Sequence, residues 1–361
     1  MKILHICNMK SGIDMYVRNT IMHASDDFDF VIVHGDEDGN NPIVKNGHKV
    51  KEYCIPLYRR LNPLKDGKAL LQTVQIVLKE KPDVIHCHSA KGGFIGRLAG
   101  FITGVRTLYT PHAFSFLSAE SKQKQLIYRR IEQLSKLNSY LLACSESELS
   151  LGKMYVHYRP KKALVWQNAL PDVDGQVLDD TVPYICYVGR PSYQKNTFFM
   201  LDVVREVHAR LPEIKFYLLG AAYYSPDSDE LKRRIIVYGL EDTFKLLPWK
   251  SHNETLMYIR NSLLYLTVAR YEGLSLAVIE AMALSKAIVA SDVVGNRDCV
   301  KDGVNGYLLP LKVDLFVEKI CMLVNDVHKR MEIESQSRAL FESQFLIDNR
   351  IKELETIYRQ K

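Results

Sequence analysis

The chain has 361 residues, of which 47% are hydrophobic and 25% are charged, and its formal net charge is +6. These ordinary values exclude disorder, collagen and coiled coil as the main architecture, and the length predicts two or three domains. The charge is uneven, because residues 1–170 hold 24 Lys and Arg against 15 Asp and Glu. A basic first half favours anionic partners such as phosphates or an acidic lipid surface, although a solvated basic surface explains it equally well.

Short apolar runs alternate with longer amphipathic segments through the first half of the chain. Strands are predicted at Lys2–Cys7, Phe28–His34, Val50–Ile55, Val84–His88, Val105–Thr110, Tyr140–Cys144 and Ala163–Trp166. Helices are predicted at Asp14–Ala24, Leu64–Lys79, Gly93–Ile102, Ser121–Leu137 and Glu146–Lys153. This alternation predicts a doubly wound α/β domain, and the continuously apolar strands suit a parallel sheet that is covered on both faces.

Residues 171–183 break the alternation with two prolines, a glycine, four acids and no base, which predicts a linker. A second α/β domain follows. Its strands are predicted at Tyr184–Gly189, Lys215–Leu219, Phe244–Leu247, Leu263–Val268, Ala287–Ala290 and Tyr307–Leu309. Its helices are predicted at Thr197–Leu211, Glu230–Tyr238, Asn253–Arg260, Ser275–Leu284 and Leu315–Asn325. The chain from about Ser335 is predicted to be helical, with an apolar stripe at Ile347, Ile351, Leu354 and Tyr358.

The seven cysteines form no CxxC pair, and most lie in apolar runs. They are expected to be small buried residues in a reducing compartment. The sequence has no apolar run of about 18 residues, and the apolar run near its start is too short for a signal peptide. We therefore expect a cytoplasmic protein.

The most informative segment, residues 270–283, directly follows a predicted strand. Gly273 permits a tight turn there, and Ser275 suits a helix N-cap. The backbone N–H groups of Leu274, Ser275 and Leu276 would then form an anion site at the end of the strand, where ligands bind in open α/β sheets.

Two carboxylates flank that turn. Glu272 beside Gly273 suits the hydroxyls of a sugar, because a carboxylate only accepts hydrogen bonds. Glu280 lies about one and a half turns into the helix and leans toward its start, so it suits two adjacent sugar hydroxyls. A carboxylate that stabilises the helix dipole, together with one surface Glu, is the alternative explanation.

A basic loop ends the first strand of the second domain. Arg190 and Lys195 follow Gly189 and are separated by a proline-containing loop, so both can project over one anion. A surface turn with two solvated bases is the alternative. Together with the two carboxylates, this loop predicts a ligand that carries both phosphate and hydroxyl groups.

With these motifs the chain resembles the retaining nucleotide-sugar glycosyltransferases of family 4, which have the GT-B fold. The resemblance covers nearly the whole chain, and segments of the first half are similar to members that build bacterial surface polysaccharides, either capsular polysaccharide or exopolysaccharide. It rests on Gly189-Arg190 with Lys195-Asn196, the Glu-x7-Glu pair Glu272 and Glu280, and the segments Pro82–Gly100, Tyr109–Phe116, Ala143–Glu148, Asn168–Leu170 and Val300–Tyr307. It implies two Rossmann-like domains facing across a cleft: residues 1–170 with 345–361, the C-terminal helix crossing back, on the acceptor side, and residues 171–344 on the donor side.

The resemblance also implies roles for individual residues. Arg190 and Lys195 would bind the donor diphosphate and stabilise it as the leaving group, with Gly189 beside them. Glu272 would contact the transferred sugar, and Glu280 would hold the ribose. The amides of Leu274 to Leu276 would cap the diphosphate, and Gly273 would contact the donor from the turn before them. In the first domain, His112 would face the donor sugar, and Gly12 would approach the diphosphate and the acceptor.

The sequence departs from the family pattern in three places. Ser11 stands before Gly12 where the family often has a second glycine, the turn reads Glu-Gly-Leu-Ser-Leu-Ala, and the segment after Gly295 lacks its usual Glu. No Asp-x-Asp pair stands in a credible position, because residues 172–174 and 227–229 lie in turn-rich loops. We therefore expect transfer that needs no metal and no cofactor. Front-face substitution is what the resemblance implies, and double displacement stays open because no nucleophile can be identified.

The expected partners are a nucleotide-sugar donor and a glycan or polyprenyl-diphosphate-linked acceptor, with no nucleic acid. The helix at 121–137 pairs an apolar stripe with Lys122, Lys124, Arg129 and Arg130, which suits either the core or a contact with the inner face of the cytoplasmic membrane. Three alternatives stay open: a GT-B-fold sugar-nucleotide epimerase, a non-enzymatic two-lobed binding protein and a nicotinamide dehydrogenase. The last lacks the G-x-G-x-x-G fingerprint.

Overall fold

The computed structural model describes residues 1–9, 11–35, 41–58, 62–177, 182–221, 225 and 227–360. The chain forms two compact units, residues 1–169 with 347–361 and residues 170–346. The predicted division at 170/171 and 344/345 differs slightly from these bounds. The Leu170 N–H donates to the carbonyl oxygen of Phe345, and Leu170 pairs with Leu346, so these three residues stay in the second unit.

The first unit contains a parallel sheet in the order β5-β2-β1-β6-β7-β8-β9. Its strands are β1 (Lys2–Ile6), β2 (Asp29–Gly35), β5 (Lys51–Ile55), β6 (Val84–His88), β7 (Arg106–Thr110), β8 (Tyr140–Ala143) and β9 (Ala163–Val165). A short antiparallel pair joins β3 (Val44–Lys45) to β4 (His48–Lys49). Parallel pairing requires a crossover between neighbouring strands, and the helices supply it.

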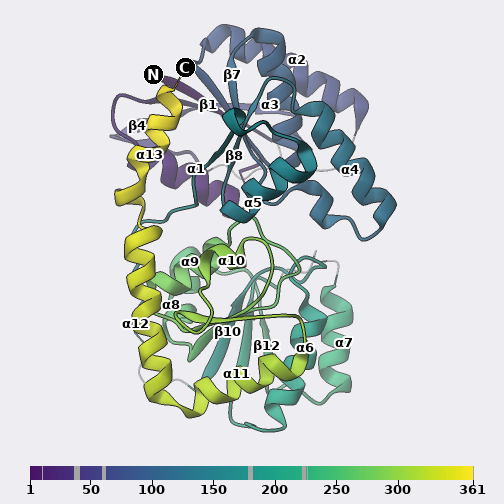
Figure 1. Cartoon of the computed structure of the whole chain (residues 1–361), viewed down its shortest axis with the longest axis vertical. Helices are drawn as coiled ribbons and strands as arrows, with labels where there is room; N and C mark the ends of the chain where they lie inside the picture. The colour runs from purple at the N-terminus through teal and green to yellow at the C-terminus, as the bar shows by residue number, and fades with distance from the viewer. Residues whose placement is uncertain are drawn as a thin grey trace. The chain divides into compact units, whose positions relative to one another are not determined.

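The helices of the first unit are α1 (Ser11–His23), α2 (Pro63–Glu80), α3 (Ser89–Thr103), α4 (Lys122–Ser135), α5 (Glu146–Leu151) and α13 (Ile347–Arg359). Three single turns lie at η1 (Ser115–Ser118), η2 (Gly152–Val156) and η3 (Pro160–Lys162). In Figure 1, α13 lies beside α1. The stripe predicted on α13 is buried, and Tyr358 donates to or accepts from His86 of β6 at 2.8 Å. The C-terminal helix is therefore part of the core of the first unit.

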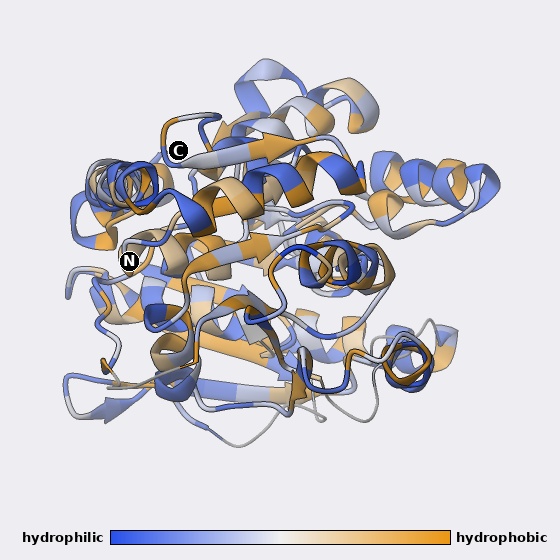
Figure 2. Ribbon diagram, turned by 90° about the horizontal axis from the view of Figure 1, so that it is seen from below, coloured by the Kyte–Doolittle hydropathy of each residue, from blue (hydrophilic) through white to orange (hydrophobic). Residues whose placement is uncertain are grey.

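The second unit contains a parallel sheet in the order β12-β11-β10-β13-β14-β15. Its strands are β10 (Tyr184–Val188), β11 (Lys215–Leu219), β12 (Phe244–Leu247), β13 (Leu264–Thr267), β14 (Ile288–Ser291) and β15 (Gly306–Leu309). Its helices are α6 (Thr197–His208), α7 (Ser228–Val237), α8 (His252–Arg260), α9 (Leu276–Ala283), α10 (Asn296–Cys299), α11 (Val313–Asn325) and α12 (Val327–Gln344). Figure 2 shows the strands mainly in the hydrophobic colour and the helices with mixed faces, as expected for sheets covered on both sides. Both units are thus Rossmann-like.

Candidate functional site

The two motifs predicted to bind the donor meet at one edge of the second sheet. The strands β10 and β13 are neighbours, so the loops that follow them lie side by side. The Arg270 N–H donates to the carbonyl oxygen of Gln194 at 2.8 Å, which ties the two loops together. The Glu272 N–H donates to the carbonyl oxygen of Val294 at 3.0 Å, which fixes the second loop on the segment after β14.

Lys195 and Glu272 form an ion pair at this edge. The Lys195 Nζ lies 2.7 Å from Glu272 Oε1, and Gln194 Nε2 donates to Glu272 Oε2 at 3.3 Å. The two charged side chains are 20% and 9% exposed, so the pair is partly shielded from solvent. A Cβ at Gly189 would lie 3.0 Å from Lys195 Cε, so any larger residue there would crowd the lysine. The structure thus brings together three residues that the sequence placed in one site.

The segment around Gly273 leads directly into α9, as predicted. Ser275 is the N-cap residue, but its side chain makes no capping hydrogen bond. Leu274 and Ser275 are buried. Gly295 also shapes this site, although its spacing in the sequence gave no sign of it. Its φ is +84°, and a Cβ there would lie 2.8 Å from the Cβ of Glu272. A glycine at 295 therefore lets the neighbouring segment pack tightly behind Glu272.

Glu280 of α9 accepts a hydrogen bond from a residue that the sequence did not single out. The His252 Nε2 lies 2.7 Å from Glu280 Oε1, and the Glu280 side chain is 4% exposed. His252 begins α8 just after Ser251, which forms a capping box with Glu254. The hydrogen bond to Glu280 raises the pKa of His252 above its ordinary value, against the opposing effect of burial. Below the pKa of His252, its imidazolium therefore pairs with the Glu280 carboxylate.

The His252 pair predicts a pH-dependent stability. A histidine with a raised pKa in the folded state contributes stability that is complete below its unfolded pKa of about 6.5 and is lost as the pH rises through the folded value. We expect His252→Gln to lower the melting temperature of the second unit more at about pH 6 than at about pH 8.5. Because His252 is half exposed, about 1 M salt should shrink the difference.

Thermal scans at both pH values test this expectation. His157→Gln is the control, because His157 lies in no ion pair of the described residues. An equal loss at both pH values would contradict the proposed pairing.

Arg190 is the predicted diphosphate contact, and Arg297 is a second base, in the segment after Gly295. Arg190 directly follows Gly189 at the end of β10, and its carbonyl oxygen accepts a hydrogen bond from the Ser192 hydroxyl at 3.2 Å. Arg297 instead forms an ion pair with Asp292. Asp292 raises the pKa of Arg297 through this contact. Arg190 thus lies in the loop after β10, and the side chain of Arg297 is engaged by a neighbour.

His112 and Gly12 lie in the first unit. Gly12 lies in the first turn of α1, because this helix begins at Ser11 and not at the predicted Asp14. The segment predicted as a loop is therefore a helix start at the end of β1, and Lys10 lies outside the described residues. His112 follows β7 with a left-handed backbone, φ +51°, and Ala113 has φ +81°. Such angles are strained for residues other than glycine.

A hydrogen bond from Ala113 holds this strained turn. The Ala113 N–H donates to Glu148 Oε1 at 2.7 Å, and the Cys144 N–H donates to Glu148 Oε2 at 2.9 Å. Glu148 is fully buried, and its own N–H donates to the Ser145 hydroxyl at 3.0 Å. The predicted Ser-Glu segment at the end of β8 thus supports the turn that carries His112.

Four histidines gather at the ends of β1, β6 and β7. His88 Nδ1 lies 3.1 Å from His112 Nε2, and His88 Nε2 lies 2.9 Å from His5 Nδ1. His86 bonds instead to the Tyr358 hydroxyl and to Thr110 Oγ1. The rings of His5, His86 and His88 lie close enough to share a metal ion. However, five of their six ring nitrogens take part in these hydrogen bonds, so a metal would have to displace them.

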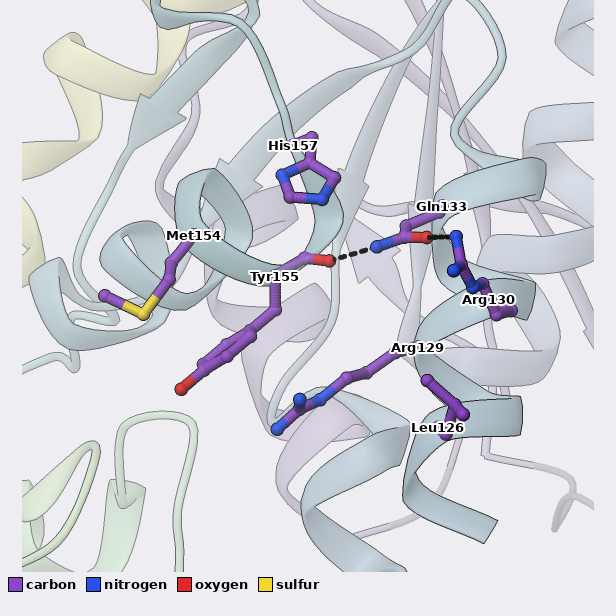
Figure 3. A pocket seen from close by; sticks show the side chains of 7 residues that line it. All are labelled: Leu126, Arg129, Arg130, Gln133, Met154, Tyr155 and His157. Carbon is purple, nitrogen blue, oxygen red and sulfur yellow. Dashed lines mark hydrogen bonds between the residues drawn. The ribbon is translucent and has the colours of Figure 1, made fainter. Parts of the chain in front are cut away.

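The helix α4 presents an exposed surface in the first unit. Leu126, Ile127 and Leu134 are 57%, 55% and 77% exposed. A hollow of about 240 Å³ separates part of this helix from the segment after α5. Figure 3 shows Arg129 and Arg130 of α4 on one side of the hollow and Met154 and Tyr155 on the other, joined by Gln133. The surface thus combines exposed apolar side chains with bases. No described helix has both the length and the apolar run that are needed to span a bilayer.

Comparisons with known families and structures agree with this architecture. The family model for glycosyl transferases group 1 matches residues 172–340, and that for glycosyltransferase family 4 matches residues 10–172. Among solved structures, that of HepE from Anabaena in complex with UDP and glucose has a TM-score of 0.82 at 19% identity and covers 100% of both chains. The apo form of the lipopolysaccharide outer core galactosyltransferase WaaB has a TM-score of 0.69 at 18% identity and covers 99% of this chain and 98% of that one.

Two bacterial enzymes are similar over most of their length. The UDP-Gal:alpha-D-GlcNAc-diphosphoundecaprenol alpha-1,3-galactosyltransferase of Escherichia coli is 25% identical over 86% of this chain and 84% of its own. The capsular polysaccharide biosynthesis glycosyltransferase CapM of Staphylococcus aureus is 23% identical over 88% of each chain. Together with the two family models, these similarities show that the chain is a glycosyltransferase of family 4 with the GT-B fold.

Proposed function

We propose that this glycosyltransferase moves a hexose-type sugar, with retention, from a nucleoside-diphosphate sugar to a glycan or polyprenyl-diphosphate-linked acceptor in surface polysaccharide assembly. The arrangement of Lys195 and Glu272 beside the start of α9 carries the proposal, because it places a cation and a hydroxyl acceptor 2.7 Å apart at the edge of the sheet. The activity named for the E. coli relative supports a lipid-diphosphate acceptor. The UDP and glucose bound to HepE support a nucleotide-sugar donor.

The chemistry of the transfer explains the cations. Breaking a glycosyl–phosphate bond builds negative charge on the diphosphate and positive charge on the sugar. Fixed positive groups stabilise the first of these charges. Arg190, Lys195 and the N-terminal turn of α9 are the groups that we assign to this task, while Glu272 and Glu280 bind hydroxyls at the two ends of the donor.

We also propose that no metal takes part. A metal bound through an Asp-x-Asp pair would need free carboxylates. The two pairs in this chain are at residues 172–174 and 227–229, and in the first pair the carboxylate of Asp172 is bound by an arginine. Arg338 donates to both carboxylate oxygens of Asp172 at 2.7 Å each. This contact lowers the pKa of Asp172. In the second pair, Asp227 is the N-cap residue of α7, although its side chain makes no capping hydrogen bond.

A donor screen tests the proposal. Isothermal titration with UDP, GDP and NAD should show binding of at least one nucleoside diphosphate in the presence of EDTA. A panel of nucleotide sugars should then identify one that releases its nucleoside diphosphate, and NMR of the anomeric proton should show retention in the product. Binding of NAD alone, or inversion of the anomeric centre, would overturn the proposal, and conversion of the donor sugar without transfer would favour an epimerase.

Replacing Glu280 should weaken nucleotide binding. If Glu280 accepts hydrogen bonds from the ribose, Glu280→Ala removes bonds to a charged group and should raise the Kd for UDP by about 10- to 100-fold with little change in kcat. Titration of UDP into the variant measures this. His252→Ala serves as the control, because it removes the partner of Glu280 and keeps the carboxylate. An unchanged Kd in Glu280→Ala would show that Glu280 does not hold the nucleotide.

The α4 surface is our candidate for contact with an acidic membrane. Residues 115–162 contain nine Lys and Arg and four Asp and Glu, and two of those acids, Glu132 and Glu148, are buried. Exposed leucines beside a net positive surface suit the boundary between lipid headgroups and acyl chains. A lipid-linked acceptor would be presented there.

Liposome binding should depend on this surface. The double variant Lys122→Gln, Lys124→Gln is expected to bind vesicles rich in phosphatidylglycerol about thirtyfold more weakly, since each base near an acidic membrane contributes ~1 kcal/mol. Flotation at low salt measures the binding. The double variant Lys232→Gln, Lys301→Gln in the second unit removes the same charge elsewhere and should float as the unmodified protein does. Equal loss in both double variants would exclude α4 as the specific contact.

A further inference from the structure

We propose that His5 and His88 are positioning residues that hold His112 as the neutral tautomer with its proton on Nδ1. The assignment of a catalytic purpose to this tautomer rests on the proposed function, in which His112 faces the donor sugar. The tautomer itself follows from hydrogen bonds within the first unit and can be measured without any substrate.

The three rings form a chain of hydrogen bonds. His112 Nε2 bonds to His88 Nδ1 at 3.1 Å, and His88 Nε2 bonds to His5 Nδ1 at 2.9 Å. His5 comes from β1 and His88 from the end of β6, and both are fully buried. The ring planes of His5 and His88 lie within 17° of parallel, and those of His88 and His112 within 22°. The three imidazoles therefore lie end to end in a row, with their planes nearly parallel.

Neutral rings in such a row are not independent. Each neutral imidazole has one N–H and one lone pair, and each hydrogen bond needs one of each. If His5 donates to His88, then His88 must donate to His112, and His112 must carry its proton on Nδ1. In the opposite arrangement, His112 donates to His88, His88 donates to His5, and His5 is left with an N–H on Nε2.

The buried end of the row decides between the two arrangements. His5 Nε2 has no hydrogen-bond partner among the residues that the structure describes. An N–H group stranded in the interior is rarer in proteins than an acceptor with an unused lone pair. The arrangement that leaves only a lone pair on His5 Nε2 is therefore favoured. Because no described residue is hydrogen-bonded to His5 Nε2, the row fixes a tautomer and does not conduct protons.

Burial keeps the rings neutral. It lowers the pKa of His5 and of His112 to about 3. It also lowers the pKa of His88 well below its ordinary value, and the neighbouring imidazoles add to this effect. No carboxylate is hydrogen-bonded to any of these three rings in the described parts of the chain. At neutral pH the row therefore contains no imidazolium.

At the open end of the row, the Nδ1–H group of His112 is placed to bind a ligand. The strained turn fixes the backbone of His112, and the ring of Tyr16 packs edge-on against it with centroids 4.9 Å apart. His112 Nδ1 has no partner in the described residues and is left to meet a ligand. A neutral N–H can orient a sugar hydroxyl by donating to its oxygen. It does so without placing a full positive charge beside the positive charge that develops on the sugar.

Nitrogen NMR of the protein labelled with ¹⁵N-histidine tests the tautomer directly. The signals of His112, identified by their loss in His112→Gln, should show a protonated Nδ1 and an unprotonated Nε2 from about pH 6 to pH 8. A protonated Nε2, or an imidazolium in this range, would overturn the proposal. This measurement needs only the spectra of the unmodified protein and of the His112→Gln variant, in which the replaced side chain is partly exposed.

Two substitutions at His5 separate positioning from simple packing. His5→Phe keeps a ring against Phe30 but removes the donor, so His112 should become a mixture of tautomers. His5→Asn keeps an N–H close to the position of Nδ1 and should restore the Nδ1–H form. His86→Phe is the matched control: it replaces an equally buried ring outside the row, and it should leave the tautomer of His112 unchanged. An unchanged tautomer in His5→Phe, or a mixture in His86→Phe, would contradict the role of His5.

Enzyme kinetics then test the catalytic purpose. With the donor found by the nucleotide-sugar screen, His5→Phe should lower kcat about tenfold at an unchanged KM, and His5→Asn should recover most of it. An unchanged kcat in a variant whose His112 tautomer has become mixed would show that the tautomer has no catalytic purpose. If the expected tautomer is seen but no nucleotide sugar is turned over, the proposed function fails and the histidine row stands.

Discussion

Glu272→Gln is expected to lower sugar transfer by about 10²- to 10³-fold while leaving the affinity for UDP unchanged or severalfold tighter. Both halves of this expectation come from the ion pair with Lys195. In the free protein the Glu272 carboxylate lies 2.7 Å from Lys195 Nζ. It therefore neutralises the positive charge of Lys195, which we assign to binding the diphosphate. Glutamine keeps the shape of the side chain but leaves the lysine without a counter-charge, so an incoming diphosphate meets a stronger field.

The loss of turnover has a separate origin. A carboxylate can accept two strong hydrogen bonds from sugar hydroxyls, and a glutamine replaces one acceptor by a donor. The variant should therefore hold the nucleotide well and the sugar poorly. Titration with UDP and turnover of the nucleotide sugar, measured on the same preparation, give the two numbers.

A carboxylate elsewhere in the second unit provides the matched control. Glu230 on α7 forms ion pairs with Arg233 and Arg234 on the surface. Glu230→Gln should change neither binding nor turnover. Transfer at the unmodified rate in Glu272→Gln would remove Glu272 from the site. A large loss of UDP affinity would instead show that Lys195 needs its partner to stay in place.

Features set by short-range spacing could be predicted from the sequence. The alternation of strands and helices gave the two Rossmann-like units, and the stripe on residues 347–358 correctly indicated a buried helix. The turn at Gly273 and the start of α9 follow from neighbouring residues. The spacing of His86 and His88 in β6 predicts that both lie on one face of the strand, because side chains alternate in a strand, and their ring centroids lie 4.1 Å apart.

Contacts between distant residues could not be predicted in the same way. The partner of Glu280 lies 28 residues earlier. The row of histidines joins β1, β6 and the turn after β7 through residues 5, 88 and 112. The start of α3 was also predicted wrongly at its glycines: the helix begins at Ser89, not at Gly93. A Cβ at Gly96 would lie 2.4 Å from Cys87 Cβ, so that glycine lets the helix approach the sheet.

A buried ion pair was likewise invisible in the sequence. Arg97 of α3 and Glu132 of α4 are 35 residues apart, and each is of a residue type that is usually exposed on the surface. In the structure their side chains are 1% and 2% exposed, with Arg97 Nη2 lying 3.0 Å from Glu132 Oε2. The Tyr109 and Ser115 hydroxyls each donate to Glu132 Oε1 at 3.1 Å. Glu132 thus attaches α4, and with it the proposed membrane surface, to the core of the first unit.

Glu132→Ala is therefore expected to destabilise the first unit by about 3–5 kcal/mol, because it leaves the Arg97 guanidinium buried without its counter-charge. Replacing both partners, as in Arg97→Met with Glu132→Leu, should recover much of that loss. An apolar pair of similar size carries no charge that must be neutralised in the interior. Urea unfolding followed by Trp166 fluorescence reports on this unit alone if exposed Trp249, the second of the two tryptophans, is first replaced by Phe. The Arg97 guanidinium carbon lies 3.9 Å from the centroid of the Tyr109 ring. If the double variant proved less stable than Glu132→Ala, the stabilising interaction would be the packing of Arg97 on this ring and not the pairing of charges.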